Sequence, residues 1–206
     1  MKRFDILKPE KQQRIISAAL NEFTRNGYKK ASTNQIIKEA GISKGSLFTY
    51  FKNKKELYLF LLNHVTKVIE EIYAEVDWSE TDYFARLKQL GLVKYKVYKK
   101  YPQAFDFLNS TAKEDAGEVK KEIETLKHSL ISSGMERGYE NIDYSRFRTD
   151  IDLEKTKNLI SLAILGLAEQ QRAKVQSIDE VDETLLDEFD EYFSIMKRCF
   201  YKKEAQ

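Results

Sequence analysis

The sequence predicts an all-α protein: an N-terminal head of three helices, joined by a long helix to a helical body, with about nine helices in all. Three observations support this class. Glycine and proline total only ten of 206 residues, about 5%, whereas an average chain carries roughly 12%. Apolar residues recur three or four positions apart along most of the chain, which is the period of an α-helix. No segment shows the alternation that is typical of a strand.

Composition excludes several classes of protein. The single cysteine, Cys199, cannot form a disulfide within the chain or a multi-cysteine zinc site. Two histidines, His64 and His128, leave little for metal or triad chemistry, so we expect no metal, no cofactor and no enzymatic activity. No run of about 18 apolar residues predicts a membrane span. The N-terminus lacks the apolar core of a signal peptide, which predicts a cytoplasmic protein.

Charge is distributed unevenly along the chain. The whole sequence carries a net charge of +2. Residues 1–55 contain 13 basic and 4 acidic side chains, a net of +9, and the remainder carries −7. A basic head on an acidic body favours a polyanionic partner at one end only. A solvated, lysine-rich surface is the alternative.

Capping residues set the limits of the head helices. Pro9 suits the first turn of a helix, and Gly27 can end that helix because glycine adopts positive φ without strain. Ser32, with Gln35 three positions on, has the spacing of a capping box. Gly41 ends this second helix, and a third begins after Ser43. Residues 33–51 are therefore predicted to form a short helix, a glycine turn and another short helix.

The body is predicted to be helical throughout. Asn53 and Glu56 start a helix that keeps one apolar face as far as Val76, which is long enough to join head and body. Further helices are expected from about 81 to 100, after Pro102, from 114 to 137, after Asp152 and from Asp182. Residues 138–151 show no period and are expected to form a loop.

The segment 33–57 suits a helix-turn-helix that binds DNA. Gly41 allows the sharp turn, and apolar residues on both sides of it can lock the two helices together. The second helix then begins with small and basic residues, Ser43, Lys44, Gly45 and Ser46, which let the backbone enter the major groove closely. Its N-terminus would also direct free N–H groups towards phosphate.

Residues 12–57 carry a dense set of further matches. They are Ile16-x-x-Ala19-x-x-x-Phe23-x-x-x-Gly27-Tyr28, Thr33-x-x-Ile36, Ala40-Gly41-Ile42-Ser43-Lys44-Gly45, Tyr50-Phe51 and Lys54-x-x-Leu57. In this segment the chain resembles the TetR family of bacterial transcriptional regulators (TetR/AcrR type). Two positions depart from the commonest pattern. Ile37 replaces alanine, which is a packing change, and Phe48 replaces tyrosine, which removes a hydroxyl directed at phosphate.

The resemblance implies a role for each motif residue. The positions that usually face base edges are Asn34, Lys44, Gly45 and Ser46. The positions that would meet phosphate are Thr33, Ser43, Thr49, Tyr50, Lys54 and Lys55. Plainer interpretations remain open: Thr33 and Ser43 as helix caps, Tyr50 as core, and the lysines as solvated surface. The resemblance divides the chain into a DNA-binding domain, residues 1–52 with the helix-turn-helix at about 32–51, and an effector-binding and dimerisation domain, residues 53–206.

The body supplies candidates for two further sites. The candidates for an apolar effector pocket are His64, Ile72, Trp78, Phe84, Tyr95, Tyr98, Phe105, Phe107, Leu108 and Met135. Each of them could instead be ordinary core. The last two predicted helices carry more apolar surface than one short bundle needs, which favours a two-fold dimer through a four-helix bundle. The dimer-interface candidates are Leu159, Ala163, Gly166, Leu167, Leu186, Phe189, Phe193 and Met196.

The function that follows is a homodimeric transcriptional repressor, which binds a pseudo-palindromic double-stranded operator and is released by a small apolar effector, with no role at a membrane. An architectural DNA-binding protein without an effector is the first alternative, although it leaves the aromatic-rich body unexplained. An enzyme is the second, and no G-x-G-x-x-G, P-loop or H-E-x-x-H motif supports it.

Overall fold

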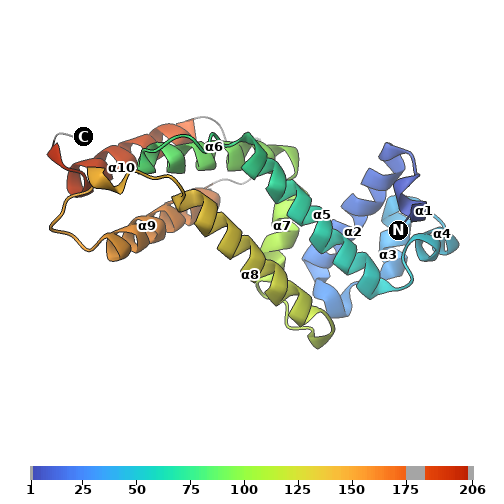
Figure 1. The fold of residues 1–206 in the computed structure, drawn as a ribbon. Helices are drawn as coiled ribbons and strands as arrows, with labels where there is room; N and C mark the ends of the chain where they lie inside the picture. Colours follow the sequence, from blue (N-terminus) through green and yellow to red (C-terminus); the bar gives the residue numbers. More distant parts are fainter. Residues whose placement is uncertain (1, 175–183, 204–206) are drawn as a thin grey trace. The chain divides into compact units, whose positions relative to one another are not determined.

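The computed structural model describes residues 2–174 and 184–203, and within them it contains ten α-helices, one short 3₁₀ helix and no strand (Figure 1). The predicted all-α class is confirmed. The helices are α1 (Lys2–Asp5), α2 (Pro9–Lys30), α3 (Thr33–Ala40), α4 (Lys44–Tyr50), α5 (Lys54–Glu75), α6 (Tyr83–Lys100), α7 (Pro102–Thr111), α8 (Gly117–Tyr139), η1 (Tyr144–Arg146), α9 (Leu153–Lys174) and α10 (Thr184–Phe200). The predicted start at Asp182 lies outside the described residues.

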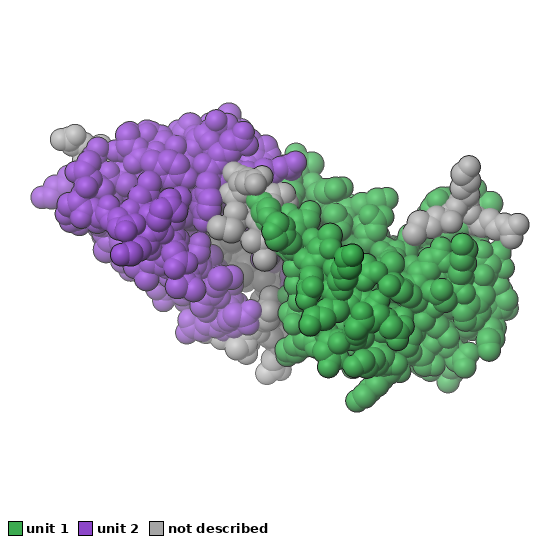
Figure 2. All heavy atoms as spheres, turned by 60° about the horizontal axis from the view of Figure 1, so that its bottom comes forward, with its two compact units in different colours: residues 1–74, 100–134 green, residues 75–99, 135–206 purple. Residues whose placement is uncertain are grey.

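The chain divides into two compact units, which are coloured separately in Figure 2. Unit 1 comprises residues 1–74 and 100–134, and unit 2 comprises residues 75–99 and 135–206. Unit 1 thus combines the head with nearly all of α5, with α7 and with most of α8. The functional division at residue 52 stays a prediction.

The core of the head forms where α2 packs against α3 and α7. Its central side chains, Ile15, Ala19, Phe23, Ile36 and Leu47, are all almost completely buried. They come from the helix-period positions of three elements, so packing of amphipathic faces holds the head together.

The predicted capping residues of the head are found in the structure, although α2 continues past Gly27 to Lys30. Gly27 has a φ of +66° and ends the regular part of α2, and Gly41, with a φ of +63°, closes α3 in the left-handed conformation. The Ser32 hydroxyl accepts a hydrogen bond from the Gln35 backbone N–H. The Asn53 side chain caps α5 by accepting from the N–H of Glu56 at 2.9 Å.

An aromatic stack continues the core of unit 1 from α2 through α5 to α7. The ring of Tyr58 lies edge-on to Phe23, Tyr28 and Phe107, with centroid distances of 4.9 to 5.2 Å. Burial, followed by the nearby Glu114 charge, raises the pKa of Tyr58, which keeps its hydroxyl protonated. The contacts with Phe23 and Tyr28 join α5 to α2, and the contact with Phe107 joins it to α7.

Unit 2 has its own aromatic core. It is built from Tyr83 and Phe84 on α6, from α9 and α10, and from the segment around Phe147, which lies opposite Tyr201 in an isolated bridge. The buried Arg86 guanidinium donates to the carbonyls of Trp78, Glu80, Arg137 and Glu140, and so ties the segment before α6 to the end of α8.

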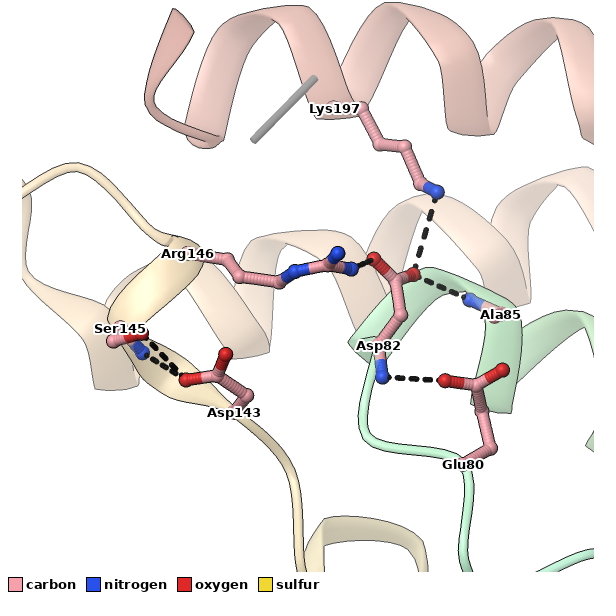
Figure 3. A network of polar contacts seen from close by, with 7 residues as sticks. All are labelled: Glu80, Asp82, Ala85, Asp143, Ser145, Arg146 and Lys197. Atoms are coloured by element: carbon pink, nitrogen blue, oxygen red, sulfur yellow. Dashed lines mark hydrogen bonds and ion pairs between the residues drawn. The ribbon is translucent and has the colours of Figure 1, made fainter. Parts of the chain in front are cut away.

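Asp82 organises the polar border of this core (Figure 3). Its carboxylate caps α6 by accepting from the Ala85 N–H at 2.8 Å, and it pairs with Arg146 and Lys197. Burial alone would raise its pKa, but the Ala85 N–H and the two cations hold that pKa below its usual value. Asp82 therefore joins the start of α6 to η1 and α10.

Within the described residues, no helix is both long and apolar enough to cross a membrane.

Candidate nucleic-acid interface

The helix-turn-helix consists of α3, the turn at Gly41 and α4. Ile36 and Ala40 on α3, and Leu47 on α4, are buried and hold the two helices together. Leu47 is the only buried residue of α4. The other six positions of this helix are exposed or half-buried, so α4 offers nearly its whole outer surface to a partner.

Three of the four predicted base-facing residues, Lys44, Gly45 and Ser46, lie in the first turn of α4. Lys44 and Gly45 are exposed, and Asn34 is exposed on α3. No atom lies within 4 Å of the position that a Cβ on Gly45 would occupy. The half-buried Ser46 has its hydroxyl 2.9 Å from that of Ser43. The start of α4 is therefore small, uncrowded and basic, which suits close approach to a groove.

Two of the hydroxyl-bearing phosphate candidates, Ser43 and Thr49, form hydrogen bonds within the head. The Ser43 hydroxyl accepts from the Ser46 N–H at 3.2 Å, and the Thr49 hydroxyl donates to the Gly45 carbonyl at 2.8 Å. Thr33 is not a cap, because Ser32 caps α3 and Thr33 is the first residue of that helix, where it is half-buried. The capping interpretation of Ser43 is thus realised, and a hydroxyl that caps can still bind a second group.

Both lysine candidates contact the protein itself. The Lys54 ammonium donates to the carbonyls of Lys29 and Ala31 at 3.1 and 3.3 Å and lies 4.8 Å from the centre of the Tyr28 ring. It therefore caps the end of α2, and the third of its N–H groups is left for phosphate. Lys55 pairs with Glu122 on α8 at 2.8 Å. Phosphate contacts of these lysines remain predictions.

Residues 41–45 also fit the G-x-S-x-G pattern of serine hydrolases. The spacing of these residues alone does not show whether they form a hydrolase site or another structure. In those enzymes the serine sits on a sharp turn between a strand and a helix. Here Ser43 follows a helix and serves as the N-cap of α4. The pattern therefore belongs to the helix-turn-helix.

Two parts of the site were missed by sequence reasoning. The short helix α1 places the buried Phe4 against the aromatic end of α4. A segment of four helical residues is too short for periodicity to reveal. The acidic residues just before and at the start of α8 were also missed: Glu114, Asp115 and Glu118 bind the end of α2, about 86 to 90 residues earlier.

Comparison with known proteins agrees with this geometry. Residues 15–60 match the family model described as bacterial regulatory proteins, tetR family. The head of this chain therefore resembles the DNA-binding domain of the TetR family. The chain is 30% identical over 128 residues to the HTH-type transcriptional regulator YuxN of Bacillus subtilis. The aligned segment covers 62% of this chain and 43% of YuxN. The chain is 32% identical over 96 residues to RutR of Escherichia coli, 46% of this chain and 44% of RutR.

The fold is also shared over the full length. A crystal structure of a TetR family transcriptional regulator from Chloroflexus aurantiacus superposes with a TM-score of 0.74 at 21% identity, covering 98% of this chain and 99% of the other. The sequence matches, in contrast, span less than half of YuxN and of RutR. The TetR-type head is therefore supported by sequence and by structure, and the body by fold.

The effector candidates of this protein fall in both units. Phe107 lies in the aromatic stack of unit 1, whereas Phe84 lies in the core of unit 2. Ile72 and Phe105 are also buried, and His64, Trp78, Tyr95, Tyr98 and Leu108 are half-buried. Nothing is described for the Met135 side chain. The ordinary-core interpretation holds for Phe84 and Phe107, and the pocket stays a prediction.

The dimer candidates divide by exposure. Leu159 and Gly166 on α9 are exposed, and Ala163, Leu167, Phe189 and Met196 are half-buried. Phe193 instead packs against Phe84 within the core of unit 2, with 5.8 Å between the two ring centroids. The Leu186 side chain lies outside the described part. Sequence periodicity did not single out Leu162, Leu165 and Ile195, which are 58%, 61% and 47% exposed.

Proposed function

We propose that this protein is a sequence-specific transcriptional regulator, a homodimeric repressor that binds a pseudo-palindromic operator and leaves it when a small apolar effector binds. The observation that carries the proposal is the tightly capped α3–Gly41–α4 unit, whose second helix buries only Leu47 and exposes a small, basic first turn. That combination suits a recognition helix in a major groove.

Dimerisation rests on the outer side of α9. Leu159, Leu162 and Leu165 recur three positions apart on the side opposite the buried Ile160. Large exposed aliphatic side chains in a row are costly in water and mark an interaction surface. A two-fold copy of the same helix would cover them, and it would place two heads on a DNA site with matching symmetry.

Release by an effector rests on the way α5 and α8 hold the head. Lys55, at the start of α5, pairs with Glu122, and Tyr28 donates its hydroxyl proton to Glu118 at 2.9 Å. A shift of either helix would therefore displace the end of α2 and the start of α5. A ligand that favours the shifted state by a few kcal/mol would change the populations many-fold, since each ~1.4 kcal/mol is a factor of ten.

Selection of DNA by the purified protein tests the proposal. A random-sequence duplex library should yield a pseudo-palindromic site, and native mass spectrometry of the complex should show two chains on it. An architectural protein would enrich no sequence. Dimerisation is tested by Leu162→Lys with Leu165→Lys, which should give monomers that bind the selected site weakly. Ile6→Lys is the matched control, because Ile6 is 82% exposed in the head and lies far from α9 in sequence.

A further inference from the structure

The N-terminal helix α1 carries an anchored aromatic residue. Phe4 is only 2% exposed, although it is the fourth residue of the chain and precedes the segment that matches the family model, residues 15–60. Its ring centroid lies 5.0 Å from that of Phe60 on α5 and 5.2 Å from that of Phe51, the residue that follows α4. Burial of this large apolar ring holds so short a helix in place.

One side chain on α2 fastens α1 a second time. The Gln12 amide nitrogen lies 3.1, 3.2 and 3.0 Å from the carbonyl oxygens of Phe4, Asp5 and Leu7, and its two N–H groups are shared among these three acceptors. These three carbonyls belong to the end of α1 and the turn that follows it. Because the amide sits on the stable helix α2, it fixes the position of Phe4 relative to the helix-turn-helix.

The Phe4 ring contacts Tyr50, a residue that is predicted to bind DNA. The Phe4 ring meets Tyr50, the last residue of α4, edge to face at 5.9 Å and 70°. The Lys11 ammonium lies 5.8 Å from the centre of the same tyrosine ring. Tyr50 is half-buried, so part of it faces solvent while its ring is bounded by groups from α1 and α2. The direction of the Tyr50 hydroxyl therefore depends on where Phe4 sits.

We propose that Phe4, fastened by Gln12, is a positioning residue for DNA binding, which orients Tyr50 so that its hydroxyl donates to a backbone phosphate. This inference rests on the proposed function, since it needs α4 to lie in a major groove. It extends the DNA-binding unit to α1, beyond the matched helix-turn-helix domain. Phe4 acts through Tyr50 and does not itself touch DNA.

A double-mutant cycle on a duplex selected by the wild-type protein tests the inference. Tyr50→Phe should weaken binding about tenfold, the loss of one hydrogen bond to a charged group. Phe4→Ala should weaken it by a similar factor. In the Tyr50→Phe background, Phe4→Ala should cost at most about twofold more, because the hydroxyl it positions is already gone. Ethylation interference should show the same phosphate losing its effect in both single variants.

Stability separates positioning from a general loss of structure. The fall in melting temperature caused by Phe4→Ala should be the same with Tyr50 or with Phe at position 50, so only DNA binding should show the non-additivity. Gln12→Ala keeps the Phe4 side chain and should weaken the contact at the same phosphate. If Phe4→Ala does not fold, this variant tests whether the position of Phe4 affects DNA binding. Ile6→Ala, an exposed position in the same segment, should bind as the wild type does.

The outcomes are distinct. Two results would overturn the positioning role and leave the proposed function intact. In the first, the losses of affinity caused by Phe4→Ala and Tyr50→Phe multiply to about a hundredfold in the double variant. In the second, neither Phe4→Ala nor Gln12→Ala changes the affinity. A wild-type protein that enriches no duplex would instead overturn the proposed function.

Discussion

The Glu114 carboxylate accepts a hydrogen bond from the backbone N–H of Tyr28, at 2.6 Å, across 86 residues of sequence. Its other oxygen accepts from the N–H of Ala116 at 2.9 Å, next to the start of α8. One carboxylate therefore binds both the bend at the end of α2 and the residue that precedes α8. Since Tyr28 is buried, its N–H has no access to water as a substitute.

Replacing Glu114 should destabilise the protein. Glu114→Ala leaves the Tyr28 N–H without its partner, and an unsatisfied buried donor costs about 1–3 kcal/mol. Asp115→Ala is the matched control, because it removes only an exposed pair with Lys29, which is worth about 0–1 kcal/mol. Urea unfolding measures both. Equal effects of the two substitutions would mean that the Glu114 bond contributes no more than a surface pair.

Alanine at two glycines should have opposite effects on stability. Gly27 has φ +66° and ψ 174°, a conformation essentially reserved for glycine, and a Cβ there would lie 3.1 Å from a Glu114 oxygen. Gly27→Ala should therefore cost about 1–3 kcal/mol. Gly45→Ala meets no atom within 4 Å and should stabilise α4 by about 0.5–1 kcal/mol.

The same Gly45→Ala variant should bind the selected operator more weakly, because the added methyl group keeps α4 from approaching the groove. Thermal unfolding and an electrophoretic mobility shift assay on one sample measure the two effects. A variant that is more stable and binds as tightly as the wild type would remove Gly45 from the interface.

Lys54 should contribute to stability as well as to DNA binding. Lys54→Met removes a cation from the carbonyls at the end of α2, which should cost about 0.3–1 kcal/mol. It should also weaken binding to all DNA sequences alike, if the ammonium meets phosphate. Lys52→Met, at a neighbouring exposed position, is the control for charge alone. Loss of stability without loss of affinity would restrict Lys54 to its capping role.

His64 should make the free energy of unfolding depend on pH. Burial, followed by the nearby Lys67 charge, lowers its pKa below the ordinary value of 6.5. The unfolded chain then takes up the proton first, so stability is retained above about pH 6.5 and falls as the pH drops towards the folded-state pKa. His64→Gln should flatten this part of the profile, and His128→Gln, at an exposed position, should not. An unchanged slope for His64→Gln would contradict the assignment.

Local signals predicted the head well. The caps at Ser32 and Asn53, the glycines at 27 and 41 and the helix limits follow from interactions within a few residues of each other, which a sequence displays directly. Asp152 also caps its helix as expected, accepting from the N–H of Lys155 at 3.0 Å.

Contacts between distant segments could not be predicted in this way. The capping of α2 by Lys54 and the bonds of Glu114 join positions 23 to 86 residues apart. Periodicity also identifies an apolar face without naming its partner. Phe193 shows this, since it fits the apolar pattern of the last helix but packs in the core of unit 2, whereas Leu162 and Leu165 are exposed.

The central claim is that α4 reads a DNA sequence. Its most direct test is the affinity of the wild-type protein and of Lys44→Ala for the selected duplex and for a scrambled duplex, measured over a range of salt concentrations. We predict that the wild type binds the selected duplex more tightly than the scrambled one. Its affinity should fall steeply with salt, because lysines release counterions from phosphate. Lys44→Ala should reduce the preference for the selected duplex by about 1–3 kcal/mol, through lost discrimination at particular bases. Equal affinity of the wild type for both duplexes at every salt concentration would contradict the account.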